Sequence, residues 1–217
     1  MKLARLAPAL VFSLLLASPA QAQFGLFKSA MDKGTEAYEK QDYEAAFKHW
    51  TKAAGKGVAE AEYRLGRLYD RGEGTAEDPE QALVWYAKAA AQGVQEAQTN
   101  LGVLYDTGRG TAEDNRTAAR WFREAAAKGN KVAQYNLAVM LDNGDGIPVN
   151  KPQAAALYNA AAAQGITLAL LPHAKILDQL GKPVAAYQKF AEADEAGFLE
   201  ATYVVGVKLQ RGSGVAQ

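Results

Sequence analysis

One pattern recurs along the chain at a fixed spacing, and it limits the possible folds more than any other feature. The stretch LGRLYDRGEGTAEDPEQA begins at Leu65, and LGVLYDTGRGTAEDNRTA begins 36 residues later at Leu101. A period of this length is typical of helical arrays in which each copy packs on the next. The alternative is a duplicated catalytic loop. The residues around the repeated segment decide between the two.

Several other positions keep the same spacing. The glycines that close successive copies are Gly57, Gly93, Gly129, Gly165 and Gly197, spaced by 36 residues three times and then by 32. Two series of alanines recur in phase with them, namely Ala61, Ala97, Ala133, Ala169 and Ala201, and Ala82, Ala118, Ala154 and Ala186. Chance similarity in an alanine-rich chain would drift in phase, so the series indicate one structural unit that is repeated.

Each unit is predicted to contain two helices. In the first, Ala61, Leu65, Leu68 and Tyr69 stand three or four residues apart and form one apolar stripe. Gly66 lies beside this stripe, although glycine costs a helix about 1 kcal/mol relative to alanine. We therefore expect another backbone to pass too close to Gly66 for a side chain.

The stretch between the two helices has the residues of a turn. Pairs of glycines end the first helix, and an N-cap residue begins the second. The glycine pairs are Gly72/Gly74, Gly108/Gly110 and Gly144/Gly146, and the N-caps are Asp78, Asp114 and Asn150. GTAED is thus predicted to be a turn followed by a cap, not a catalytic loop.

The N-terminal segment has the pattern of a secretory signal. A basic start, an apolar run and the small residues Ala20 and Ala22 predict removal of residues 1–22, with cleavage between Ala22 and Gln23. The alternative is an uncleaved membrane anchor, although the run is short for a membrane span. We expect a periplasmic or secreted protein whose mature chain has no integral membrane segment.

Composition excludes several classes of function. The chain has no cysteine, which excludes disulfides, thiolate zinc sites and a thiol nucleophile. Lys+Arg and Asp+Glu both total 24, so no basic surplus points to nucleic acid. About half of the residues are apolar (49%), enough for a continuous core.

The pattern A-x-x-x-L-G-x-x-Y-x-x-G-x-G-x-x-x-D…A-x-x-W…A-A-x-x-G resembles the Sel1-like repeat (SLR) family, a branch of the tetratricopeptide-like (TPR-like) superfamily. The resemblance implies an all-α fold, a right-handed superhelical solenoid of helix-turn-helix repeats. Its predicted division is a signal peptide (1–22), a TPR-like repeat (23–57), three full repeats (58–93, 94–129 and 130–165), a short degenerate repeat (166–197) and a half repeat (198–217), with 23–217 as one solenoid domain.

The resemblance also implies a role. Members of the family mostly act as protein-binding scaffolds and adaptors. Some cysteine-rich secreted members are linked to β-lactam binding or hydrolysis, but this chain lacks the paired cysteines and the activity is not carried over.

No residue pattern nominates a catalytic, cofactor or metal site. His173 stands where other units have leucine and is expected to be a core residue, whereas His49 is expected to be solvated. The stretch LDNGDGIPVN offers oxygen ligands, but counting from Asp142 places glycines at the third and fifth positions that a calcium loop requires as ligands. We expect no cofactor.

By analogy with TPR packing, one concave face is lined by the first helices, and aromatic, aliphatic and charged side chains there suit a peptide or a partner's helix. The predicted partner-binding residues are Tyr63, Arg67, Asp70, Thr99, Val103, Asp106, Tyr135, Val139, Asp142, Lys175 and Tyr203, with Leu171, Asp178, Val207 and Gln210 at equivalent positions.

Three hypotheses for function remain open from the sequence. The first is an exported, non-enzymatic scaffold or adaptor of the bacterial envelope that binds a protein or peptide on the concave face. The second is a cell-wall or β-lactam-binding or hydrolysing enzyme. The third is a structural spacer in an envelope complex, because Val204, Val205 and Leu209 of the last half repeat would leave an apolar edge for another chain to cover. The oligomeric state is left open.

Overall fold

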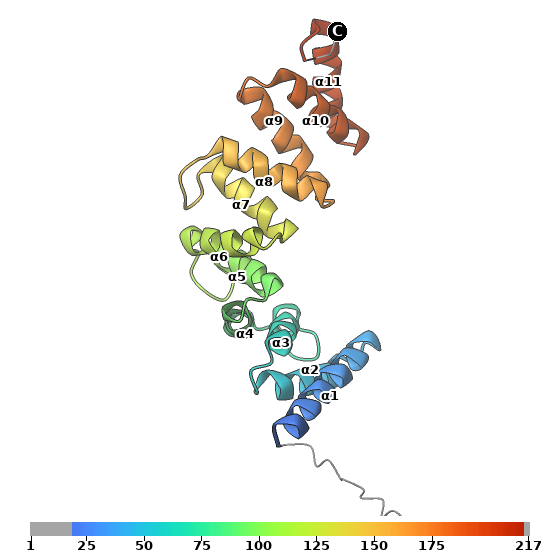
Figure 1. Ribbon diagram of the computed structural model, residues 1–217, viewed down its shortest axis with the longest axis vertical. Coiled ribbons are helices and arrows are strands. Elements are labelled where there is room, and N and C mark those ends of the chain that lie inside the picture. The colour runs from blue at the N-terminus through green and yellow to red at the C-terminus, as the bar shows by residue number, and fades with distance from the viewer. Residues whose placement is uncertain (1–18, 215–217) are drawn as a thin grey trace, which may run out of the picture.

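The helices of the protein stack in chain order along one long axis, as Figure 1 shows. The computed structural model describes residues 19–214. Substantial packing joins each helix to its neighbours in sequence rather than to distant ones. This is the solenoid that the repeat pattern predicts, and within the described range it contains no strand.

The helices form five pairs followed by a single helix. The pairs are α1 (Pro19–Glu39) with α2 (Tyr43–Ala54), α3 (Ala59–Arg71) with α4 (Pro79–Ala91), α5 (Gln95–Thr107) with α6 (Asn115–Ala127), α7 (Lys131–Asn143) with α8 (Lys151–Ala163), and α9 (Leu170–Gln179) with α10 (Pro183–Glu195). A short 3-10 turn, η1 (Thr167–Ala169), precedes α9, and α11 (Leu199–Arg211) is the single last helix.

The predicted helix ends are confirmed. Asp78 accepts a hydrogen bond from the Gln81 N–H at 2.9 Å, and Asp114 and Asn150 cap α6 and α8 in the same way. Gly72 ends α3 in the left-handed conformation with a φ of 66°. A side chain is strained in that conformation, so these turns require glycine.

The core is a row of rings from the second helices set against small residues of the first. Along the chain these rings are Trp50, Tyr86, Phe122, Tyr158 and Phe190, and all five are almost fully buried. A Cβ on Gly66 would lie 2.7 Å from the ring of Tyr86. The expectation that a backbone passes close to Gly66 is therefore wrong, because an aromatic ring occupies that space.

Backbone does approach closely at the second glycine of each turn. A Cβ on Gly110 would lie 2.4 Å from the carbonyl oxygen of Pro79, at the start of the preceding second helix. In the same way, a Cβ on Gly74 would clash with the backbone of Tyr43, and a Cβ on Gly146 would clash with that of Asn115. These three turns therefore close over the N-terminal end of the second helix one repeat earlier.

Buried amides join successive repeats at the other end of the helices. Gln98 is 2% exposed, and its Nε2 donates to the carbonyl of Ala90 at the end of α4. Its Oε1 accepts from Lys128, which also donates to the carbonyl of Gly93. Gln134, 36 residues later, donates to Ala126 in the same way. Each amide thus ties its helix to the preceding second helix.

Glu62 occupies the equivalent position one repeat earlier and is 4% exposed. It accepts a 2.7 Å hydrogen bond from Gln92 Nε2. Unlike an amide, a glutamate side chain has no N–H group to donate, and no hydrogen bond joins Glu62 to the carbonyl of Ala54 as the glutamines are joined to theirs.

The predicted signal peptide lies mostly outside the described residues and stays a prediction. The expected cleavage between Ala22 and Gln23 falls in the first turn of α1. None of the described helices combines the length and apolar character needed to cross a bilayer.

Candidate functional site

The residues predicted to bind a partner lie on α3, α5, α7 and α9, the first helices of their pairs, and on the single last helix α11, and we call this set the first-helix face. Asp106 and Tyr203 are exposed, the latter by 74%. Thr99 is 4% exposed, and its hydroxyl donates to the Gln95 carbonyl of its own helix. The others, Tyr63, Arg67, Asp70, Val103, Tyr135, Val139, Asp142 and Lys175, are half-buried. Thr99 therefore offers little surface to a partner.

An aromatic and cationic cluster forms the N-terminal part of this face. The guanidinium of Arg67 lies 5.8 Å from the ring centroid of Tyr38 and 5.9 Å from that of Tyr63. Tyr38 donates its hydroxyl proton to Glu73 at 2.9 Å. Cation–π contacts and this hydrogen bond hold the side chains in place while leaving them partly accessible.

Asp70 connects two repeats at the next position along the face. It accepts from the Tyr86 hydroxyl at 3.2 Å and lies 3.2 Å from the guanidinium of Arg109, in the following turn. Arg109 also pairs with Glu77 at 2.8 Å. Burial, followed by the nearby charge of Asp70, raises the pKa of Tyr86, so this tyrosine stays protonated as a donor.

Aspartates recur every 36 residues along the face, and their partners differ. Asp142 pairs with Lys151, and Asp178 pairs with Lys208 at 2.7 Å. Asp106 has neither an ion-pair nor a hydrogen-bond partner within residues 29–214. Although Asp106 is exposed, partial desolvation by its surroundings and then the charges of Asp145 and Glu113 raise its pKa. Phe122 stands where Tyr86 and Tyr158 have a hydroxyl, which removes one donor from its surroundings.

The middle of the face is mainly apolar and packs inward. The rings of Tyr135 and Tyr158 have centroids 5.8 Å apart, and Val103 and Val139 pack on the same core cluster. Burial raises the pKa of Tyr158, with a smaller effect from Asp142. These side chains therefore support the fold as well as lining the face.

The C-terminal part of the face borders a cavity of about 340 Å3 between α9 and α11. Tyr203, Val207 and Asp178 line it. Lys175 pairs with Glu200 at 2.7 Å. Leu199 and Leu209 of α11 are also exposed, whereas Val204 and Val205 pack partly against the core. Of the three residues expected to form an apolar edge, Leu209 is exposed as predicted, whereas Val204 and Val205 are half-buried. The remaining apolar exposure lies at Leu199 and Tyr203.

Two contributors to this face were missed in the sequence. Tyr38 belongs to the irregular first repeat, where its position corresponds to that of Asp70 in the next repeat. Fewer residues separate Tyr38 from Trp50 than separate Asp70 from Tyr86, so the repeat spacing does not identify it. Arg109 lies inside a turn that was interpreted only as a helix break. A charged residue between two turn glycines was the available signal.

The described residues bring together no group of three His, Asp or Glu side chains that could hold a metal ion. The calcium-like stretch illustrates this, since Asp142 pairs with Lys151 and Asp145 accepts from Asn143. His173 is 6% exposed and its Nδ1 has no partner, whereas His49 is half-exposed.

Comparisons with known proteins agree with this architecture. The family model described as Sel1 repeat matches residues 20–58, 59–94, 95–130 and 131–166. No curated protein matches the chain. A Sel1 repeat protein from Oxalobacter formigenes is 30% identical, with a TM-score of 0.77 over 84% of this chain and 77% of its own.

A second solved structure is a protective antigen of uropathogenic Escherichia coli with an SLR fold. It is 29% identical, with a TM-score of 0.82 over 91% of this chain, which spans only 44% of the antigen's length. The four family-model matches cover most of the residues between 20 and 166, and the helix pairs they delimit are those of the structure. The chain therefore belongs to the Sel1 repeat family.

Proposed function

We propose that the protein is an exported, non-enzymatic scaffold of the bacterial envelope that binds a partner protein or peptide on its first-helix face. Sel1 repeat proteins are generally scaffolds for protein interactions. Envelope location is supported by the N-terminal signal pattern in the sequence.

The observation that carries the proposal is the Arg67 cluster. Three side chains from α1 and α3 are preordered by cation–π contacts and by the Tyr38–Glu73 hydrogen bond, yet they remain partly accessible. Tyrosine and arginine are enriched among residues that dominate protein interfaces. Preordering lowers the entropy that binding must offset.

The partner test uses crosslinking in the intact cell envelope followed by recovery of the protein. Arg67→Glu removes the cation and reverses its charge, and Asp106→Lys reverses an exposed, unpaired charge further along the face. Both variants should lose the crosslinked partner, while Lys56→Glu, an exposed change away from the face, should retain it. Equal recovery with all three variants would reject the first-helix face as the binding surface.

Export is tested separately. Mass spectrometry of protein isolated from the periplasm or the medium should give a chain that begins at Gln23. A full-length chain confined to the cytoplasm would reject the envelope assignment and leave the scaffold proposal standing.

A further inference from the structure

A groove of about 560 Å3 opens between α8, α9 and α10, away from the first-helix face. Its apolar lining includes Ala155, Leu177 and Leu180. Its polar lining includes His173, Lys182 and Lys189. None of these three polar residues belongs to the predicted partner-binding set.

The groove exists because the fifth helix pair lacks parts that fill this place in earlier pairs. The turn between α9 and α10 is short, and Gly181 has nothing within 4 Å of a built Cβ, whereas Gly74, Gly110 and Gly146 close onto the preceding second helix. Lys189 also stands directly before the buried Phe190, at the position that Trp85 and Trp121 hold before Tyr86 and Phe122. Those tryptophans pack on the core of the preceding pair.

His173 lies in the lining of this groove at a position where Leu65, Leu101 and Leu137 fill the core of other repeats. It is 6% exposed, and Nδ1 is buried without a hydrogen-bond partner. Buried polar atoms are nearly always satisfied in folded proteins. The imidazole therefore forms a buried part of the groove wall, beside which a ligand would lie.

The N-terminus of α10 opens onto the same groove. Lys182 holds the N-cap position and makes no side-chain cap, although Asp78, Asp114 and Asn150 cap the equivalent helices. The N–H of Ala185, which lines the groove, is the group that would receive such a cap. Uncapped N–H groups, the positive end of the helix and the Lys182 ammonium together favour an anionic oxygen. Lys189 already pairs with Glu192 at 2.8 Å and contributes less positive charge.

We propose that this groove binds a segment of a partner protein in which a carboxylate side chain lies beside an aromatic one. The carboxylate caps α10 and pairs with Lys182, and the ring takes the place of the absent tryptophan beside the imidazole of His173, which lines the groove. The chain's own earlier repeats show that this place accepts an indole and a peptide turn. The proposal rests on the general scaffold role but not on the first-helix face.

The probe is acetyl-Asp-Gly-Trp-amide, because side chains two residues apart in an extended peptide point to the same side. Binding is followed by NMR on protein carrying isotope-labelled histidine. The two histidines make the experiment internally controlled. The imidazole signals of His173 should shift and saturate, while those of His49 stay fixed. Acetyl-Asn-Gly-Trp-amide and acetyl-Asp-Gly-Ala-amide should each bind about tenfold more weakly or worse, since each lacks one contact.

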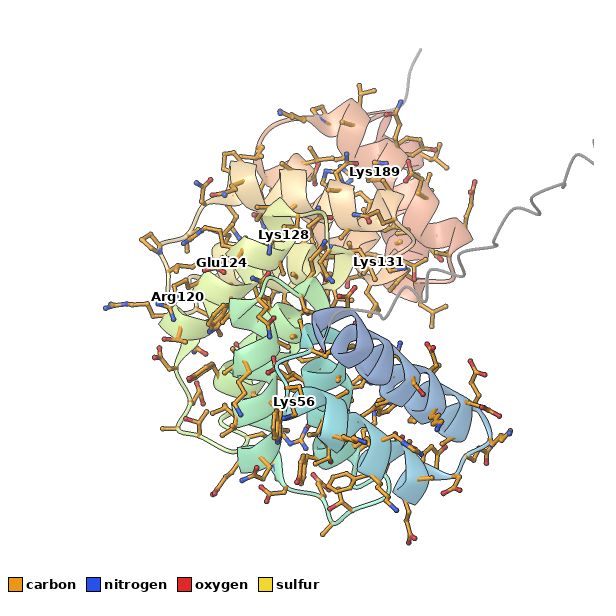
Figure 2. All side chains as sticks on the ribbon, turned by 60° about the horizontal axis from the view of Figure 1, so that its bottom comes forward. Lys56, Arg120, Glu124, Lys128, Lys131 and Lys189 are labelled. Atoms are coloured by element: carbon orange, nitrogen blue, oxygen red, sulfur yellow. The ribbon has the colours of Figure 1, made fainter. Side chains whose placement is uncertain are left out.

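Three variants locate the site. Lys182→Asp supplies an internal cap in place of the ligand carboxylate, and Lys189→Trp introduces the side chain that Trp85 and Trp121 provide at the equivalent position of two earlier pairs. Both should abolish the His173 shift with the chain still folded by circular dichroism. Lys56→Asp, at the opposite end of the molecule from Lys189 in Figure 2, should bind as the parent does.

Arg67→Glu should also leave peptide binding unchanged, which separates this proposal from the first-helix face. The proposal is overturned if millimolar peptide gives no saturable His173 shift. It is also overturned if the asparagine peptide binds equally well, or if Lys182→Asp binds like the parent.

Discussion

An aromatic ring packs against the helix glycine in α5 but not in α11. The substitution Gly→Ala is therefore predicted to have opposite effects on stability at these two equivalent positions. A Cβ on Gly102 of α5 would lie 2.7 Å from Cε1 of Phe122, closer than real Cβ contacts. Gly206 holds the equivalent position in α11 and has nothing within 4 Å. The change Gly→Ala therefore adds the same methyl group to a crowded helix and to an open one.

The two substitutions share one favourable effect and differ in one unfavourable effect. Replacing glycine by alanine inside a helix stabilises it by about 1 kcal/mol. Forcing a methyl group into a filled core costs about 1–3 kcal/mol. Gly206→Ala should therefore raise the free energy of unfolding by about 1 kcal/mol, whereas Gly102→Ala should lower it by about 0–2 kcal/mol. The gap of about 1–3 kcal/mol between them measures the steric conflict with Phe122.

Urea unfolding followed by far-ultraviolet circular dichroism measures both values, provided that the slopes with urea agree, because helical arrays can unfold in parts. Combining Gly102→Ala with Phe122→Leu in a double-mutant cycle should give a favourable coupling energy, since the smaller side chain leaves room for the methyl group. Equal stabilisation by Gly102→Ala and Gly206→Ala, with no coupling to Phe122, would refute the ring-on-glycine reasoning.

Four further substitutions test the caps, the buried amides and two titrating groups, each by the same unfolding measurement. Asp78→Ala should cost about 1 kcal/mol because the 2.9 Å cap of α4 is lost. Glu62→Gln should add about 0.5–1.5 kcal/mol because an amide can donate to Ala54 as the equivalent glutamines donate to their carbonyls; no gain would contradict that role. Asp106→Asn should raise the free energy of unfolding at pH 7 but not at pH 3, because a pKa raised in the folded state means that stability falls as the carboxyl ionises. Burial, then Lys189, lowers the pKa of His173 in the folded state. Its contribution to stability is therefore fully present above the unfolded pKa of about 6.5 and is lost as pH falls from there through the lower folded pKa. His173→Leu should flatten that part of the stability profile, and an unchanged profile would contradict the assignment.

The sequence was sufficient for the helix pairs because their signals are local. Gly72 and Asp78 are required by backbone conformation and by unpaired N–H groups, which depend on neighbours within a few residues. The occupant of the space beside Gly66 depends on the rotation of two helices about their axes, and periodicity does not specify that it is a ring. Arg109 reaches Asp70 across a repeat boundary, a contact for which a single sequence carries no pairing signal.

The fifth helix pair departs from the repeat pattern at three residues that lie together in the structure. The sequence alone does not show that they are close. His173, Lys182 and Lys189 replace a core leucine, a capping residue and a packing tryptophan, and they are separated in the chain by nine and seven residues. The first two replacements remove apolar burial and a capped helix end. The third removes the cover for the preceding helix that Trp85 and Trp121 provide in two earlier pairs. If the repeat had merely degenerated, substitutions that remove stabilising contacts would be scattered over its surface. Here all three side chains line one groove, together with the short turn that leaves it open. Proteins depart from local rules chiefly at functional or strained sites. The position of all three side chains in one groove therefore favours a binding site over a merely degenerate repeat. The variant Lys189→Trp, which fills the groove, separates the two explanations. Both predict a gain in stability, but only a binding groove would also lose peptide binding.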